Sequence, residues 1–317
     1  MTIKVPCSTS NLGPGFDTLG LALNRYLFLD VILSEAKNPN IDSSVATLPQ
    51  NDKMKTIITV EGNGKNHIAI DETNLVYQSM CEFATHVGKK LPMFHLHINN
   101  EIPAYGGLGG SGAAIAGGVF LANELLHTNL SRNEMLDVAV KIEGHPDNVS
   151  AAMMGGLTIN CFEKTNGRTL HCRSVKIAAP LSIVACSPHF QVLTKQARQI
   201  LPKKLPLKDA VTNIENAASL VAALMSGDVE ALRYTTEDRL HEQYRATLIP
   251  GFEDVKKAAL DAGALSFNIS GAGPTVFSFT TKNVTEISNA LVTAFAKHGK
   301  EATFEIMHIE NDGACLI

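Results

Sequence analysis

A run of glycines in the middle of the chain is the first feature whose residue types and spacing could do chemistry. The segment PAYGGLGGSGAAIAGG places five glycines between Gly106 and Gly112, directly before a helical pattern that starts with two alanines and an isoleucine. Backbone N–H groups in such a loop can approach an anion closely, and the N-terminus of the following helix adds partial positive charge. The segment predicts a phosphate site, and the alternative is a turn that lets a helix pack closely on a sheet.

The glycine loop fits neither of two common nucleotide-binding patterns. A P-loop requires a lysine directly after its glycines, and none follows here. The dinucleotide pattern requires a β-α-β start and an acidic residue about 20 positions further on, which are not met. Other residues must therefore decide between a phosphate site and a packing turn.

A second polar segment, SNLGPGFD, lies near the N-terminus. A Gly-Pro-Gly turn interrupts the chain after a short strand, with Asn11 on one side of the turn and Asp17 on the other. A carboxylate in a cleft needs a partner, and the ammonium group of an amino acid is one candidate. The alternative is that Asp17 caps a helix that begins near Thr18.

Two more segments carry polar or glycine-rich patterns. KIEGHPDNV concentrates Glu143, His145, Asp147 and Asn148 in six residues. Acid, imidazole and amide groups in one short loop suit metal binding and hydroxyl positioning, and the alternative is a turn built around proline. SGAGP lies between two apolar strands near the C-terminus and by itself would indicate a tight hairpin.

The elements that must position these segments alternate between strand and helix. In the first half, apolar runs predict strands at residues 25–33, 57–60, 94–98 and 155–162, and helical spacing predicts helices at 74–87, 113–127 and 133–141. Residues 143–148 are expected to form a loop, and the turn-rich segment KTNGRT is a candidate domain boundary. The second half predicts strands at 181–186, on both sides of SGAGP and at 302–309, and helices at 210–225, 228–237, 252–262 and 284–297.

The bulk composition argues against several classes of protein. A chain of 317 residues that is 45% hydrophobic can bury a full core, and its length is typical of two domains. A net charge of −4 leaves no general basic surface, so no nucleic acid is expected as a partner. The start lacks a signal-peptide pattern and no run of about 18 apolar residues occurs, so we expect no membrane association and a cytoplasmic location.

Together, SNLGPGFD, the P-x-x-x-G-L-G loop and SGAGPT resemble the three sequence motifs of the GHMP kinases, in the same order along the chain. Within that superfamily the chain is most similar to the homoserine kinases, because EGHPDNV, VLTKQARQILP and HEQYRATLIP resemble segments of that group. The resemblance runs from about Val5 to Phe279.

The resemblance implies an α+β protein with the two-domain GHMP kinase fold. An N-terminal ATP-binding domain, residues 1–164, would be like domain 2 of ribosomal protein S5, and a C-terminal domain, residues 165–317, would be ferredoxin-like. The implied activity is the ATP-dependent phosphorylation of the side-chain hydroxyl of L-homoserine in threonine biosynthesis, with Mg²⁺ as cofactor and ATP as co-substrate. The alternatives are a GHMP kinase for another small alcohol such as mevalonate and a non-catalytic binding module. Family habit also suggests a homodimer.

The same resemblance assigns residues to the site. Expected at ATP are Asn74, Pro103, Gly106, Gly107, Leu108, Gly109, Gly110, Ser111, Gly112, Ala113 and Ala114. Expected around homoserine are Asn11, Asp17, His145, Asn148, Thr194, Arg198 and Arg245. The implied catalytic residues are Asp17, Asn148, Ser111 and Glu143, and the implied Mg²⁺ ligands are Ser111 and Glu143.

The charges and hydrogen-bonding groups of these residues match the carboxylate, ammonium and hydroxyl groups of homoserine. Arg198 and Arg245 can clamp its carboxylate by charge-assisted hydrogen bonds, and Asp17 with Asn11 suits its ammonium group. Asn148, with Asp147 as a second candidate, is then left to orient the hydroxyl. Because phosphoryl transfer depends mainly on alignment and charge neutralisation, we assign no general base.

Two positions of the glycine loop and one near the acidic segment depart from the family pattern. The loop commonly reads G-L-G-S-S-A-A, whereas Gly110 and Gly112 replace one serine and one alanine here. Extra glycine makes an empty loop more flexible, so the cost of ordering it predicts weak ATP binding. Lys141 stands where many relatives carry an acid, and we expect the metal carboxylate to be Glu143 first and Asp137 second.

Overall fold

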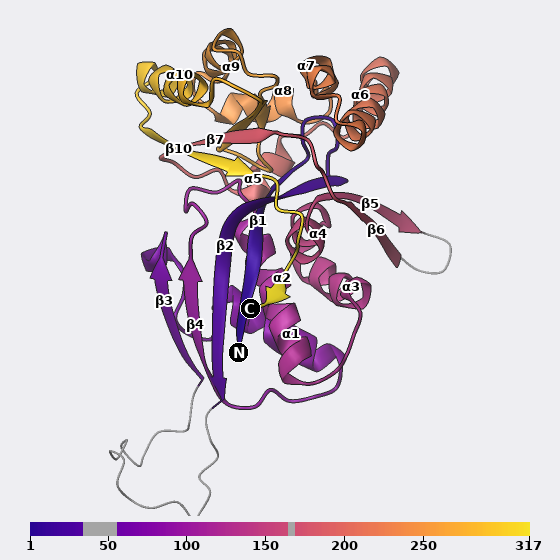
Figure 1. The fold of residues 1–317 in the computed structure, drawn as a ribbon, viewed down its shortest axis with the longest axis vertical. Helices are drawn as coiled ribbons and strands as arrows, with labels where there is room; N and C mark the ends of the chain where they lie inside the picture. The colour runs from indigo at the N-terminus through magenta and orange to yellow at the C-terminus, as the bar shows by residue number, and fades with distance from the viewer. Residues whose placement is uncertain (34–55, 164–168) are drawn as a thin grey trace, which may run out of the picture.

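The computed structural model describes residues 1–33, 56–163 and 169–317, and these form two parts stacked along the long axis of the molecule (Figure 1). One part holds a large mixed sheet with helices on one face, and the other holds a smaller antiparallel sheet with further helices. Both ends of the chain lie beside the large sheet. The α+β class expected from the sequence is confirmed.

Seven strands of the described chain form the first sheet. They are β1 (Thr2–Ser10), β2 (Leu19–Leu33), β3 (Ile57–Gly62), β4 (Phe94–Asn100), β5 (Leu157–Glu163), β6 (Thr169–Val175) and β11 (Cys315–Leu316). The order is β11-β1-β2-β4-β3, while β5 pairs with β2 and β6 with β5. The long β2 serves both arms of the sheet, because its first residues pair with β5 and its last with β4.

Four helices of the described chain cover one face of this sheet. They are α1 (Leu75–His86), α2 (Gly110–Leu125), α3 (Arg132–Glu143) and α4 (Asp147–Met154). The helix α2, most of which is buried, is central and touches the other three helices. Gly117 and Gly118 permit this position, since a Cβ on either would overlap Leu29 of β2 or the backbone of α1. A capping box between Ser131 and Glu134 begins α3.

The second sheet has four antiparallel strands within the described residues. They are β7 (Ser182–Pro188), β8 (Asn268–Ile269), β9 (Val276–Thr280) and β10 (Ala302–His308), in the order β10-β7-β9-β8. Two helices, α9 (Phe252–Asp261) and α10 (Val284–Lys297), share a buried apolar cluster with this sheet. The β-α-β-β-α-β order and the strand order are those of a ferredoxin-like domain, as expected.

The remaining helices lie between β7 and β8 or are short. They are α5 (Thr194–Gln199), α6 (Leu207–Ser226), α7 (Leu232–Thr235) and α8 (Glu242–Arg245), with 3₁₀ turns at Lys65–His67, Val229–Ala231 and Ala246–Leu248. Sequence periodicity did not reveal α4, α5, α8, β6 or β11. The helices α5 and α8 have six and four residues, too few to show a repeat.

The interpretation of residues 143–148 as one loop is wrong. Glu143 is the last residue of α3, and Asp147 is the first of α4. Gly144 takes a left-handed conformation with φ of 88° and ends α3, and the chain turns into α4 at Pro146. The polar groups of this segment are therefore held by two helix ends.

The alternative that Asp17 caps a helix near Thr18 is also wrong. Asp17 has a φ of 54° and is followed almost directly by β2. Its backbone N–H donates to Asn11 Oδ1 at 3.0 Å, so the turn is closed by its own two polar residues.

The expected domain boundary between residues 164 and 165 lies outside the described residues. On its C-terminal side, β6 pairs with β5, and β11 pairs with β1. The C-terminal half of the chain therefore adds two strands to the first sheet.

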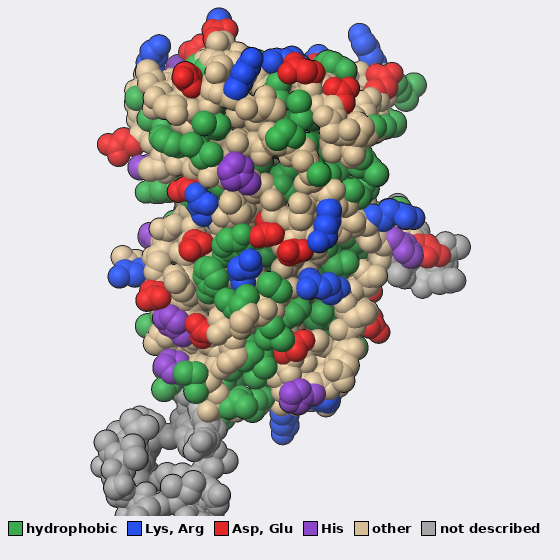
Figure 2. Space-filling view, viewed as in Figure 1, with side chains coloured by type: hydrophobic (Ala, Val, Ile, Leu, Met, Phe, Trp, Pro, Cys, Tyr) green, Lys and Arg blue, Asp and Glu red, His purple; other side chains and the backbone are tan. Residues whose placement is uncertain are grey.

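Charged side chains are mixed over the face shown in Figure 2, where Lys and Arg alternate with Asp and Glu. This mixture agrees with the near-neutral net charge of −4. Among the described helices, none is both long enough and apolar enough to span a bilayer.

Candidate active site

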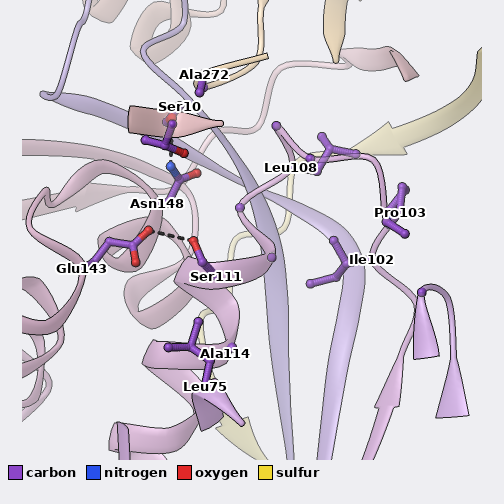
Figure 3. A pocket seen from close by; sticks show the side chains of 18 of the residues that line it. Ser10, Leu75, Ile102, Pro103, Leu108, Ser111, Ala114, Glu143, Asn148 and Ala272 are labelled. Atoms are coloured by element: carbon purple, nitrogen blue, oxygen red, sulfur yellow. Dashed lines mark hydrogen bonds between the residues drawn. The ribbon is translucent and has the colours of Figure 1, made fainter. Parts of the chain in front are cut away.

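A cavity of about 570 Å³ lies where the two parts meet, and residues of both parts line it. The first part contributes the glycine loop and the region around the N-termini of α1 and α4. The second contributes α5, α8 and the turn between β8 and β9. Figure 3 shows Glu143 and Asn148 on one side of the cavity and Ile102 and Leu108 on the other. One wall is therefore polar and the other apolar.

The glycine loop enters α2 in backbone conformations that glycine adopts readily. Gly106, Gly107 and Gly109 have φ values of 89°, 90° and 65°. A Cβ on Gly109 would overlap the side chains of Ser8 and Asn148. Gly109 is the N-cap of α2, and within the described chain no side chain caps this helix end. The first N–H groups of α2 are thus left for an anion.

The SGAGPT segment holds the glycine loop from the second part. The hydroxyl of Ser270 donates to the carbonyl of Gly107, and the hydroxyl of Thr275 donates to the carbonyl of Gly106. Ser270 Oγ also lies 2.8 Å from Thr9 Oγ1 in β1. Three segments that are far apart in the sequence therefore meet at this loop.

Ser111 and Glu143 form a pair of oxygen ligands beside the loop. Ser111 Oγ donates to Glu143 Oε1 at 2.8 Å (Figure 3). Burial raises the pKa of Glu143, and this effect outweighs the hydrogen bond from Ser111, which lowers the pKa. Mg²⁺ takes one or two carboxylates together with phosphate oxygens and water, and this pair fits that demand. The second choice, Asp137, is not among the residues that line the cavity.

His145 lies between two carboxylates. Its Nδ1 is 2.7 Å from Asp147 Oδ1, and its Nε2 is 3.7 Å from Glu143 Oε1. Burial lowers the pKa of His145, but the hydrogen bond to Asp147 and the charge of Glu143 outweigh burial, and the pKa is raised. The protonated ring would add positive charge at the edge of the cavity.

Asn148 is held in one orientation by two serines of β1. Its Oδ1 accepts from Ser8 Oγ at 2.9 Å. Its Nδ2 donates to Ser10 Oγ at 3.0 Å (Figure 3). A hydroxyl can donate or accept, so the bond that distinguishes the amide nitrogen from the oxygen is the one from Nδ2 to the carboxylate of Asp147, at 3.5 Å. Asn148 thus presents a fixed polar edge to the cavity.

Asp17 and Arg198, which also line the cavity, form a bidentate ion pair. Arg198 Nη1 lies 2.9 Å from Asp17 Oδ2, and Nη2 lies 2.8 Å from Oδ1. The hydrogen bonds to Asp17 raise the pKa of Arg198 against the effect of burial. Both side chains are about one-third exposed, at 34% for Asp17 and 37% for Arg198. An anion and a cation thus lie side by side at the cavity wall, complementary to a zwitterion.

Arg245 is a second cation and lies deeper. The residue is only 2% exposed, and its Nη1 donates to the carbonyl of Gly271 at 2.7 Å while Nε donates to that of Ala197 at 3.3 Å. Burial, followed by the charge of Arg198, lowers the pKa of Arg245. Arg245 lines the same cavity as Arg198.

Most residues expected from the sequence line this one cavity. They are Asn11, Asp17, Asn74, Pro103, Gly106, Gly107, Leu108, Gly109, Gly110, Ser111, Ala114, Glu143, His145, Asn148, Thr194, Arg198 and Arg245. Gly112 and Ala113 are buried in α2 and do not line it. The amide oxygen of Asn74 caps α1 by accepting from the N–H groups of Val76 and Tyr77.

Sequence reasoning missed the apolar wall of the cavity. Leu27 of β2, Ile98 of β4 and Leu75 and Val76 of α1 are apolar residues that line the cavity. In the sequence they are ordinary apolar residues of strands and of a helix, so they look like core. The Asn63-Gly64 turn, which also lines the cavity, is the local signal in this stretch that could have indicated a site.

Comparisons with known proteins agree with the motifs. Residues 74–156 match the family described as GHMP kinases N terminal domain, and residues 214–297 match GHMP kinases C terminal. The chain is 36% identical to a homoserine kinase of Desulfitobacterium hafniense over 318 residues, covering 99% of each protein. It is 37% identical to a homoserine kinase of Moorella thermoacetica over 315 residues, again covering 99% of each.

A solved structure agrees as well. The crystal structure of homoserine kinase from Cytophaga hutchinsonii has a TM-score of 0.82 to this chain at 29% identity, and the match covers 100% of this chain and 97% of that one. The full-length matches confirm the resemblance that the motifs indicated. The chain belongs to the homoserine kinase family of the GHMP kinases.

Proposed function

We propose that this chain transfers the γ-phosphoryl group of ATP to the side-chain hydroxyl of L-homoserine, forming O-phospho-L-homoserine in threonine biosynthesis. The observation that carries the proposal is a single cavity that joins an anion-binding glycine loop to Asp17, Arg198 and Arg245. Homoserine is a zwitterion with one hydroxyl, and this cavity has a partner for each of its groups.

The ATP end of the cavity follows from the loop and the apolar wall. The phosphates would lie against the N–H groups that begin α2, and the adenine against Leu27 and Ile98. Ser111 and Glu143 would hold Mg²⁺, which when bound neutralises charge on the phosphate oxygens.

At the other end of the cavity, homoserine would bind to the ion pair of Asp17 and Arg198. Asp17 would take the ammonium group and Arg198, together with Arg245, the carboxylate. The ammonium group would take the place of Arg198 beside Asp17, and the substrate carboxylate would take the place of Asp17 beside Arg198. Each charged side chain would therefore keep a partner of opposite charge. Thr194, the first residue of α5, lies beside this group.

The acceptor hydroxyl would lie at Asn148, between the two ends. Asn148 is fixed by Ser8 and Ser10, so it can hold the hydroxyl in line with the γ-phosphate without rearranging. His145 would add positive charge nearby. We assign no general base, because alignment and charge neutralisation supply most of the rate in phosphoryl transfer.

The proposal also includes a cytoplasmic location, a homodimer, and domains at residues 1–164 and 165–317. The homodimer is supported by the family resemblance alone, whereas the location and the domain bounds are carried over from the sequence patterns as well.

The test is ADP release from Mg-ATP in the presence of L-homoserine, mevalonate, galactose or shikimate. We expect stimulation by L-homoserine, with a turnover of about 1–100 per second as is usual for kinases. Stimulation by another alcohol instead would indicate a different GHMP kinase. Binding of ATP without turnover of any of the four would indicate a binding module, and a failure of homoserine to stimulate contradicts the proposal.

A further inference from the structure

A buried histidine, His241, lies behind the substrate end of the cavity and does not line it. It precedes α8, and its side chain is 0% exposed. His241 Nε2 lies 2.9 Å from the carbonyl oxygen of Gly13, and Nδ1 lies 3.4 Å from Arg245 Nη1. The ring therefore connects the turn that carries Asn11 and Asp17 to the deeper arginine.

The two partners determine the protonation of this ring. A carbonyl can only accept, so Nε2 must carry the proton that bonds to Gly13. A guanidinium can only donate, so Nδ1 must be the bare acceptor toward Arg245. His241 is thus a neutral ring with a defined tautomer. The other charged group within reach is Asp238, whose Oδ1 is 3.8 Å from Nε2 and whose Oδ2 accepts the N–H of His241 at 2.7 Å.

The aromatic ring of Phe16 lies beside His241 and near both arginines. Phe16, in the same turn as Asp17, has its ring centroid 5.1 Å from that of His241. The guanidinium carbons of Arg245 and Arg198 lie 5.1 Å and 5.6 Å from the Phe16 centroid. An aromatic face attracts cations, which helps two guanidinium groups to lie near one another.

The remaining bonds of Arg245 show what His241 adds. Gly271 O accepts from Arg245 Nη1 at 2.7 Å and from Asn11 Nδ2 at 3.1 Å, so this carbonyl also ties the arginine to the Asn11 turn. His241 is the second such tie. Without His241 the guanidinium would keep its bonds to the carbonyls of Gly271 and Ala197 but would lose the bond that ties it to the turn of Asp17, and could shift relative to that carboxylate.

We propose that His241 is a positioning residue that sets the place of Arg245 relative to Asp17, and thereby the spacing between the carboxylate and ammonium partners of the substrate. The inference rests on the proposed function, because it concerns how the same site recognises an α-amino acid. Arg198 is the more exposed of the two arginines and is held by Asp17 itself, whereas Arg245 is the fixed half of the clamp.

The test compares two substitutions that each keep one half of the ring's bonding. His241→Asn retains an acceptor near the position of Nδ1, and His241→Gln retains a donor near the position of Nε2. We expect His241→Gln to raise the KM for L-homoserine about tenfold, the effect of losing one hydrogen bond to a charged group. His241→Asn should stay within about threefold of wild type, and the KM for ATP should change less than about twofold in both.

Glu242→Gln is the matched control, since Glu242 is the next residue, is also buried and bonds to Ile269 rather than to Arg245. It should leave the KM for homoserine within about twofold. Thermal unfolding shows which variants fold. A folded His241→Gln with an unchanged KM for homoserine, or equal increases for homoserine and ATP, overturns the inference. Wild-type protein that does not turn over homoserine refutes the proposed function instead, so the two failures are distinct.

Discussion

Two glycines of the loop, Gly110 and Gly112, differ in how much space a side chain would have at each position. Gly110 and Gly112 both replace larger residues of the family pattern. The space around Gly110 is open to 4 Å, whereas a Cβ on Gly112 would lie 2.8 Å from Asn148 Cβ and 3.1 Å from its carbonyl carbon. Gly112 therefore brings α2 close to α4, and Gly110 does not serve packing.

The same substitution at these two positions should have opposite effects. Gly110→Ala should fold at least as well as wild type, because alanine favours the first turn of a helix. Gly112→Ala should destabilise the protein by about 1–3 kcal/mol and lower kcat, because α4 and Asn148 must move. Thermal unfolding and steady-state kinetics measure both effects. Similar results for the two variants would contradict this account of the loop.

Arg198 is the residue for which the proposed function makes the sharpest prediction. Arg198→Ala should raise the KM for homoserine about 10- to 100-fold, because a charge-assisted hydrogen bond contributes about 1.5–3 kcal/mol. The KM for ATP should change far less.

The control is Arg25→Ala. Arg25 forms a comparable two-nitrogen contact with Glu305, at 2.9 Å and 2.7 Å, outside the cavity. It should leave both KM values within about twofold. Equal increases for homoserine and ATP in Arg198→Ala would argue against the clamp.

At the scale of elements, α8 joins the second sheet through a buried acid. Glu242 Oε1 accepts the N–H of Ile269 in β8 at 2.7 Å, and Oε2 accepts from Asn268 Nδ2 at 3.2 Å. Burial, with a smaller effect from Asp238, raises the pKa of Glu242 from 4.5 to about 8. The folded protein therefore favours the protonated acid.

This raised pKa predicts a pH dependence of stability. In the unfolded chain Glu242 titrates near 4.5, whereas in the folded chain it titrates near 8. The contribution of Glu242 to the stability of the fold is fully present at pH values below the pKa of the unfolded chain, and it is lost as pH rises toward 8. The Tm of wild type should fall by a few degrees across this window relative to that of Glu242→Gln. Parallel pH profiles of Tm for the two proteins would exclude this role for Glu242.

At the scale of the whole molecule, the cavity lies at the junction of the two parts. Arg25 of β2 contacts Glu305 of β10, and β11 returns from the second sheet to pair with β1. A ligand at this junction would contact both parts at once, and binding should stabilise them together.

Thermal unfolding with ligands tests this coupling. Mg-ATP, and homoserine in a separate experiment, should each raise the Tm by a few degrees at about 100 times Kd, where binding contributes about 2.7 kcal/mol. A single transition should move as a whole. Two transitions, of which a ligand moves only one, would indicate that the parts respond separately.

The family and most of the site could be predicted from the sequence because the informative residues stand in short contiguous motifs. SNLGPGFD, the glycine loop and SGAGPT have fixed internal spacing, and most of the site residues that they named line one cavity. The long strands and helices were also predictable, since periodicity extends over enough residues to be counted. The four-residue α8 was not, and neither was the helix break between Glu143 and Asp147.

Only the tertiary structure decided which of these groups meet. Asp17 pairs with Arg198 across 181 residues, Asn148 with Ser8 across 140, and His241 with Gly13 across 228. The sequence by itself determined that these residue types exist in family motifs. Their pairing depends on the distance and direction of side chains after two sheets have packed, and hydrogen bonds of this kind leave no periodic trace in the chain.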